Sequence, residues 1–188
     1  MVKILDRADG VLLEGRESVR DLRESGASAA ELSELLAATG DELSQSASIV
    51  FNIAVIGDSR PLDSAVYKET YRIAREALSN AFQHSQATKI EVELTYNNAG
   101  ISVRVRDNGS GIDNAILGSG RAGHWGLSGM RERARKVGGQ LNIWSKAGAG
   151  TEIELTIPAA VAYPRSQGVS LWHRIKRAMS GAEGINRD

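Results

Sequence analysis

The sequence of 188 residues contains no cysteine, only three prolines and 5% aromatic residues. Without cysteine the chain cannot form disulfides, use a thiolate nucleophile or hold zinc or an iron–sulfur cluster through thiolates. Its 23 basic and 23 acidic residues cancel, which argues against a protein that grips nucleic acid with its whole surface. No apolar run approaches the roughly 20 residues of a membrane span, and the N-terminus lacks the apolar stretch of a signal peptide. These absences favour a globular domain that acts in water.

Glycine, in contrast, is concentrated in one part of the chain. Of the 20 glycines, 12 lie between Gly100 and Gly150. A glycine-dense segment between regular elements favours close approach of the backbone to a ligand, although turns alone would account for several of these residues.

Hydrophobic spacing divides the chain into helices and strands. The segments 28–45, 64–84 and 127–137 have the spacing of helices, and the segments 49–56, 90–96, 101–105, 141–145 and 151–157 are predicted strands. Most of these strands alternate, so they have one wet face and need helices on one side only. We therefore predict an α/β (α+β) two-layer sandwich with a mixed, mostly antiparallel sheet.

Five polar residues break this hydrophobic pattern. Glu76, Asn80 and His84 form one stripe on the longest predicted helix, which by itself would be an ordinary solvated edge. Asp107 and Thr151 have the same parity as the apolar residues of their strands, so their side chains should point toward the helices. A carboxylate in that position is costly unless a donor meets it. The sequence therefore predicts a polar cleft between the two layers.

Two glycine-rich loops flank this predicted cleft. The first, 108–112, follows Asp107 directly, and the second, 118–127, runs into a helix start, where backbone N–H groups can bind phosphate oxygens. The second loop contains G-x-G-x-x-G, which is weak as a dinucleotide fingerprint because no clear strand precedes it and because Ser145 and Lys146, not an acidic residue, end the strand after the helix. The chain has no P-loop motif, which excludes a Walker-type NTPase.

Four short motifs occur in order between residues 64 and 158. They are Glu76–Asn80 with His84, Asp107–Gly111, Gly123–Leu127 and Gly148–Thr151. Together they resemble the N box, the two glycine boxes and the closing Gly-Thr motif of the ATP-binding catalytic domain of sensor histidine kinases. Its Bergerat fold is shared with DNA gyrase, heat-shock chaperone and mismatch-repair ATPases.

This resemblance implies a role for each polar residue of the cleft. Asp107 would accept a hydrogen bond from the adenine amine, helped through water by Thr151. Asn80 would be a ligand of Mg²⁺, and Glu76 the base or orienting carboxylate for the incoming nucleophile. The implied ATP-binding residues are Asn80, His84, Asp107, Gly109, Gly111, Ile112, Arg121, Gly123, His124, Gly126, Leu127 and Thr151.

The runs REALSNAFQHS and GHWGLSGMRERA are most similar to the subfamily in which a short two-helix phosphoacceptor hairpin precedes the ATPase domain. Residues 1–25 would then be the second helix of that hairpin, 28–160 the ATP-binding catalytic domain and 161–188 a basic tail. A heptad spacing at residues 5–22 agrees with a partner helix, although an ordinary amphipathic helix has the same pattern.

Two departures from the family pattern stand out. Gln83 occupies the position where the family usually has Lys or Arg, so Arg121 or His84 would have to supply the cation. The chain has three histidines, His84, His124 and His173, and none lies where the phosphoacceptor is expected. We therefore expect a fragment of a longer kinase that binds ATP and does not phosphorylate itself in the usual way.

The resemblance also implies partners: the parent kinase's phosphoacceptor hairpin, a response regulator and a second copy in the full-length dimer, but no nucleic acid. It implies a cytoplasmic domain, whether or not the parent kinase is membrane-anchored. Two alternatives remain open from the sequence. One is a free-standing Bergerat-fold ATPase or anti-sigma-type serine kinase, and the other is a non-catalytic module in which nucleotide orders a docking lid.

Overall fold

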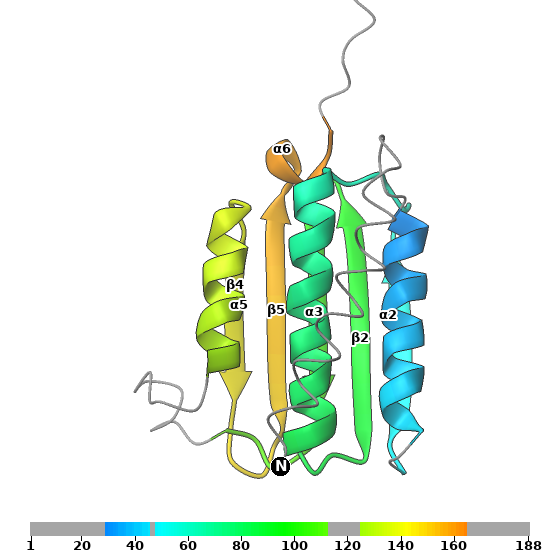
Figure 1. Ribbon diagram of the computed structural model, residues 1–188, viewed down its shortest axis with the longest axis vertical. Helices are drawn as coiled ribbons and strands as arrows, with labels where there is room; N and C mark the ends of the chain where they lie inside the picture. The colour runs from blue at the N-terminus through cyan, green and yellow to red at the C-terminus, as the bar shows by residue number, and fades with distance from the viewer. Residues whose placement is uncertain (1–28, 46–47, 113–124, 165–188) are drawn as a thin grey trace, which may run out of the picture.

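The computed structural model describes residues 29–45, 48–112 and 125–164, where a five-stranded sheet is covered on one face by three helices (Figure 1). The strand order is β1-β2-β3-β5-β4. This arrangement confirms the predicted two-layer α/β sandwich. The helices are α2 (Ala29–Ser44), α3 (Ser64–His84), α5 (Trp125–Lys136) and α6 (Ala159–Ala162), and the strands are β1 (Val50–Ile56), β2 (Lys89–Asn97), β3 (Gly100–Asp107), β4 (Gln140–Ser145) and β5 (Thr151–Pro158). The hairpin helix expected within residues 1–25 lies outside the described residues.

The sheet is mixed: one pair of neighbouring strands is parallel and the other three are antiparallel, and a second crossover runs from β3 through α5 to β4 on the far side of β5. β1 and β2 are parallel and joined through α3, whereas the pairs β2–β3, β3–β5 and β4–β5 are antiparallel. A tight turn joins β2 to β3, and the Asn97 carboxamide closes it by accepting hydrogen bonds from the N–H groups of Ala99 (2.8 Å) and Gly100 (3.0 Å). This antiparallel part of the sheet carries the end of β3 and the start of β5 to one edge.

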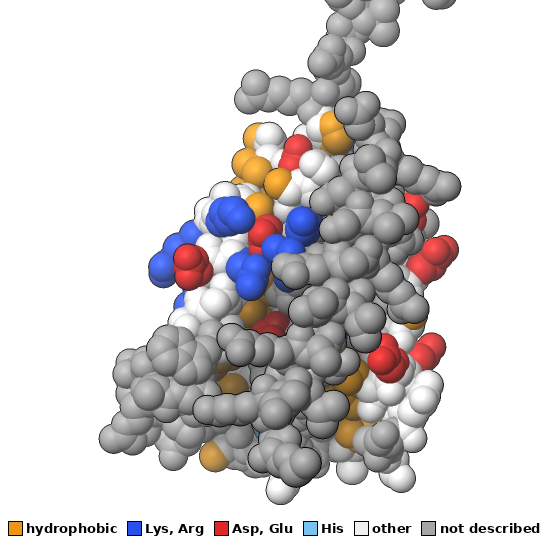
Figure 2. Space-filling view, in the orientation of Figure 1, with side chains coloured by type: hydrophobic (Ala, Val, Ile, Leu, Met, Phe, Trp, Pro, Cys, Tyr) orange, Lys and Arg blue, Asp and Glu red, His pale blue; other side chains and the backbone are white. Residues whose placement is uncertain are grey.

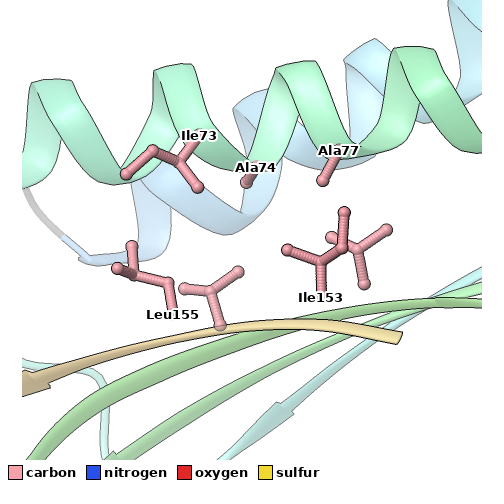
Figure 3. Close-up of a pocket in the computed structure, with 7 residues that line it drawn as sticks. Ile73, Ala74, Ala77, Ile153 and Leu155 are labelled. Carbon is pink, nitrogen blue, oxygen red and sulfur yellow. The ribbon is translucent and has the colours of Figure 1, made fainter. Parts of the chain in front are cut away.

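The long helix α3 crosses the centre of the sheet and forms the core. Asp63 caps its N-terminus, where the carboxylate accepts hydrogen bonds from the N–H groups of Ala65 (2.9 Å) and Val66 (3.4 Å). Figure 3 shows the small residues Ala74 and Ala77 facing Ile153 and Leu155 of β5 across an apolar cavity of about 10 Å³. A cavity of this size holds at most one water molecule, so it is too small for the expected nucleotide.

The packed part of the chain extends beyond the expected boundary at residue 160. Ala162 and Tyr163 are buried, and the Tyr163 hydroxyl donates to the carbonyl oxygens of Gly100 (2.7 Å) and Asn97 (3.2 Å). The expected start of the tail at 161 is therefore corrected to a position after Tyr163. A helix as short as α6 has no detectable hydrophobic period, so the sequence pattern could not reveal it.

α5 begins at Trp125, two residues before the predicted start at 127. Among the helices of the described ranges, none combines the length and the apolar character needed to cross a bilayer.

Candidate functional site

Asp107 is the last residue of β3, and its side chain lies between the sheet and the helices as predicted. The residue is 6% exposed. One carboxylate oxygen, Oδ1, accepts hydrogen bonds from the N–H groups of Gly109 (2.8 Å) and Thr151 (3.3 Å). Burial raises the pKa of this carboxyl group, and the two N–H donors partly offset that rise. Oδ1 is thus fixed by two backbone donors of the protein.

Thr151 is the first residue of β5 and is also buried, with 9% of its surface exposed. Its hydroxyl lies 2.9 Å from the hydroxyl of Ser145, the last residue of β4. Ser145 Oγ also accepts a hydrogen bond from the N–H of Ile112 (2.7 Å) and donates one to the carbonyl of Gly150 (3.1 Å). Sequence analysis did not select Ser145, although it shares the inward parity of Leu141 and Ile143.

The glycines of the first loop permit close packing of the backbone. A Cβ at Gly109 would overlap the carbonyl oxygen of Ser85 at the end of α3, and one at Gly111, which has φ +71°, would overlap that of Lys146. The N–H of Ser110 donates to the same Ser85 carbonyl at 2.7 Å. These glycines therefore bring the loop against α3 and the β4–β5 turn.

The polar stripe of α3 meets the start of α5. Glu76 and Asn80 are half-buried, and the Asn80 amide nitrogen donates to Glu76 Oε1 at 3.4 Å. A side chain on Gly126, the second residue of α5, would overlap that same Oε1. The N-terminal turn of α5, where the helix dipole is positive, therefore lies directly beside Glu76 and Asn80. His84 and Gln83 are exposed on the last turn of α3.

The remaining predicted site residues are divided between described and undescribed segments. Ile112 and Leu127 are half-buried, and Leu127 packs against the core. Arg121, Gly123 and His124 lie outside the described residues. The structure therefore does not test whether Arg121 supplies the positive charge that Gln83 lacks.

Asn80 has the chemistry of a magnesium ligand. Because its amide nitrogen donates to Glu76, its oxygen lies on the opposite side of the amide group, where it can bind a hard cation. Within residues 29–45, 48–112 and 125–164, no three His, Cys, Asp or Glu side chains are grouped so that they could hold a metal ion. A site that relies on one amide oxygen would need phosphate oxygens and water for the other positions.

A second polar cluster, away from Asp107, connects α3 to α5. The Glu69 side chain is 5% exposed and accepts from Arg133 (3.3 Å) and Lys136 (3.3 Å) of α5, with Arg72 at 3.6 Å. Burial by itself would raise the pKa of Glu69, but the hydrogen bonds and charges of these cations bring it below its ordinary value. Figure 2 shows the basic side chains gathered over α3 and α5. Sequence analysis missed Glu69, which lies two helical turns before Glu76.

Comparison with known proteins agrees with this geometry. Residues 65–161 match the family model described as histidine kinase-, DNA gyrase B- and HSP90-like ATPase. The sensor histidine kinase LiaS of Bacillus subtilis is 36% identical over 107 residues, which is 57% of this chain and 28% of LiaS. The nitrate/nitrite sensor protein NarX of Escherichia coli is 38% identical over 98 residues, which is 52% of this chain and 16% of NarX. The chain thus spans less than a third of the length of either relative.

Solved structures show the same fold. The histidine kinase domain of the blue-light activated kinase from Erythrobacter litoralis superposes with a TM-score of 0.58 at 22% identity, covering 70% of this chain and 61% of that one. The ATP-binding domain of PrrB from Mycobacterium tuberculosis gives a TM-score of 0.54 at 18% identity, covering 68% and 93%. The similarity to the sensor kinases LiaS and NarX does not favour a free-standing ATPase or an anti-sigma-type serine kinase. The chain belongs to the histidine kinase-, DNA gyrase B- and HSP90-like ATPase family, and it contains an ATP-binding catalytic domain of the sensor histidine kinase type.

Proposed function

We propose that Mg-ATP binds between α3, the start of α5 and the edge of the sheet at Asp107, and that its γ-phosphoryl group is transferred to a histidine on a separate helical hairpin. The observation that carries this proposal is the buried Asp107 carboxylate, held through Oδ1 by the N–H groups of Gly109 and Thr151. A buried acceptor with one oxygen already fixed suits the exocyclic amine of adenine, which donates hydrogen bonds.

The phosphate end of the site would lie where α5 begins beside Glu76 and Asn80. The N–H groups of the first helical turn attract anionic oxygens, and the Asn80 amide oxygen would bind the magnesium ion that neutralises part of the triphosphate charge. Gly126 allows the two helices to approach closely enough for both groups to serve one ligand. Positioning and charge neutralisation supply most of the rate in phosphoryl transfer.

In this proposal the imidazole nitrogen of the acceptor histidine attacks the γ-phosphorus. The bond from that phosphorus to the β–γ bridging oxygen breaks, and ADP leaves with the bonding electron pair. Glu76, half-buried and hydrogen-bonded by Asn80, orients the imidazole and accepts its proton. The phosphorylated histidine would then supply a response regulator, and the full-length protein would act as a dimer in the cytoplasm, where ATP is available.

The test is a transfer assay with the whole chain and a separately prepared phosphoacceptor hairpin from LiaS. With γ-labelled Mg-ATP, we expect label on the hairpin histidine, and we expect Glu76→Gln to reduce the rate by at least about a hundredfold. Glu91→Gln, on the outer face of the sheet, is the matched control and should transfer at the wild-type rate. Release of free phosphate without labelled hairpin would instead identify an ATPase.

A further inference from the structure

The hydroxyl of Ser145 joins three segments that surround Asp107. It accepts a hydrogen bond from the N–H of Ile112 in the loop after β3, donates to the carbonyl of Gly150 before β5, and contacts the hydroxyl of Thr151 at 2.9 Å. Ser145 itself ends β4. A single oxygen atom therefore connects three separate pieces of the chain at the edge where the sheet meets the helices.

These contacts occupy the hydrogen-bonding capacity of the hydroxyl. A serine oxygen has one proton and two lone pairs. The Ile112 N–H uses one lone pair, the Gly150 carbonyl takes the proton, and the Thr151 hydroxyl fills the remaining position. Ser145 is thus committed to protein groups, so its influence on a ligand is exerted through the residues that it holds.

The residues held by Ser145 are those that orient the Asp107 carboxylate. The N–H of Thr151 donates to Asp107 Oδ1, and Gly150, which has φ +85°, packs its backbone against that of Asp107. On the other side, Ile112 belongs to the loop whose Gly109 N–H is the second donor to Oδ1. Both donors to the carboxylate therefore belong to segments that the Ser145 hydroxyl ties together.

We propose that Ser145 is a positioning residue that determines base selectivity, because it fixes Thr151 and the 109–112 loop and through them the direction of the Asp107 carboxylate. This inference rests on the adenine site proposed above. A fixed acceptor distinguishes adenine, which presents an amine, from hypoxanthine, which presents a carbonyl at the same position. Loss of the hydroxyl should therefore lower the affinity for adenine more than the affinity for hypoxanthine.

The experiment compares the binding of ADP and inosine diphosphate, both with Mg²⁺, to the whole chain by isothermal titration calorimetry. For Ser145→Ala we expect ADP to bind about tenfold more weakly and inosine diphosphate within about twofold of the wild type, because the lost contact supports recognition of the amine. Ser145→Thr keeps the hydroxyl and should restore the wild-type ratio. The matched control is Ser102→Ala, which removes another strand serine hydroxyl, hydrogen-bonded to Glu154 at 3.3 Å, and should leave the ratio unchanged.

The outcomes separate the two proposals. If the wild type binds ADP and Ser145→Ala has the same ratio of ADP to inosine diphosphate affinity, the role of Ser145 is overturned, but the adenine site is not. Equal losses for both nucleotides, without rescue by Ser145→Thr, would also overturn it, since a merely structural serine behaves that way. Wild-type protein that binds neither nucleotide would overturn both proposals. Melting curves without nucleotide show whether each variant is folded, and Ser145→Cys provides the same comparison at nearly constant volume if the alanine variant unfolds.

Discussion

The N–H of Thr151 donates to Oδ1 of Asp107 at 3.3 Å, which joins the first residue of β5 to the last residue of β3 across 44 positions of sequence. The antiparallel pairing of β3 with β5 brings these two ends to the same edge of the sheet. Together with the N–H of Gly109, this bond explains how a carboxylate is accommodated in the interior. It also suggests a substitution that changes the ligand-facing atom alone.

Asp107→Asn should abolish recognition of adenine while keeping the fold. The amide oxygen can still accept from Gly109 and Thr151, but the atom that faces the ligand becomes an N–H donor, which cannot pair with the adenine amine. We expect ADP affinity to fall by at least tenfold, or about 1.4 kcal/mol. Because burial raises the pKa of Asp107, wild-type affinity should decline as the pH falls through that raised pKa, and the asparagine variant should lack this dependence. Calorimetric titration at several pH values measures both effects, and wild-type affinity in the variant would remove Asp107 from the site.

Alanine substitution of two glycines on α5 should affect different properties: Gly126→Ala should weaken nucleotide binding, and Gly129→Ala should raise stability. At Gly126 the added methyl group would overlap Oε1 at the end of the Glu76 side chain, so this carboxylate must turn away and its hydrogen bond with Asn80 is disturbed. We expect Gly126→Ala to weaken Mg-ATP binding by about 1 kcal/mol, the order of one disturbed hydrogen bond at the site. At Gly129 nothing lies within 4 Å of the added methyl, so Gly129→Ala should raise stability by about 0.5–1 kcal/mol through helix propensity and leave binding unchanged.

Thermal unfolding and nucleotide titration of both glycine variants test this contrast. Equal binding by Gly126→Ala and the wild type would show that α5 does not need its close approach to Glu76.

Glu69 should contribute stability that depends on pH. Its pKa in the folded protein lies below the ordinary value of 4.5, so the folded state favours the ionised form. The contribution is complete above the unfolded pKa and is lost as the pH falls through the lower folded pKa. We expect Glu69→Gln to reduce the free energy of unfolding by about 1–3 kcal/mol at neutral pH, with a smaller difference from the wild type in acid.

Urea unfolding between pH 3 and pH 7 measures this difference. The control is Glu91→Gln, which breaks the 2.8 Å pair with Lys89 in which both side chains are nearly half exposed, and it should cost less than about 1 kcal/mol. A pH-independent difference for Glu69→Gln would contradict the assignment of the ion-pair cluster as its source.

Tyr163 should be part of the folded unit. Tyr163→Phe removes the donor to the Gly100 carbonyl and keeps the ring beneath Arg60, whose guanidinium carbon lies 3.9 Å from the ring centroid. We expect this variant to lose about 1 kcal/mol of stability and Tyr163→Ala to lose about 3 kcal/mol or more. Unchanged melting of the alanine variant would restore the boundary at residue 160.

The sequence predicted the parts of the site that depend on local periodicity. Residues repeat every second position along a strand and about every 3.6 along a helix, so parity alone placed Asp107 and Thr151 on the inner face and Glu76 and Asn80 on one stripe of α3. The same reasoning predicted the layered fold, because strands with one wet face need helices on the other side.

Only the tertiary structure decided which of these faces meet. The register of β4 on β5 pairs Ser145 with Thr151, and the packing of α5 on α3 brings Gly126 to Glu76 and Arg133 to Glu69. No short window of sequence contains the two contacts between α5 and α3, because they depend on how two helices lie against one sheet. Ser145 and Thr151 are only six positions apart, but their pairing follows from the register of β4 on β5. The sequence likewise indicated that the backbone passes close to another group at the glycines of the first loop. Only the fold shows that these groups are the carbonyl oxygens of Ser85 and Lys146.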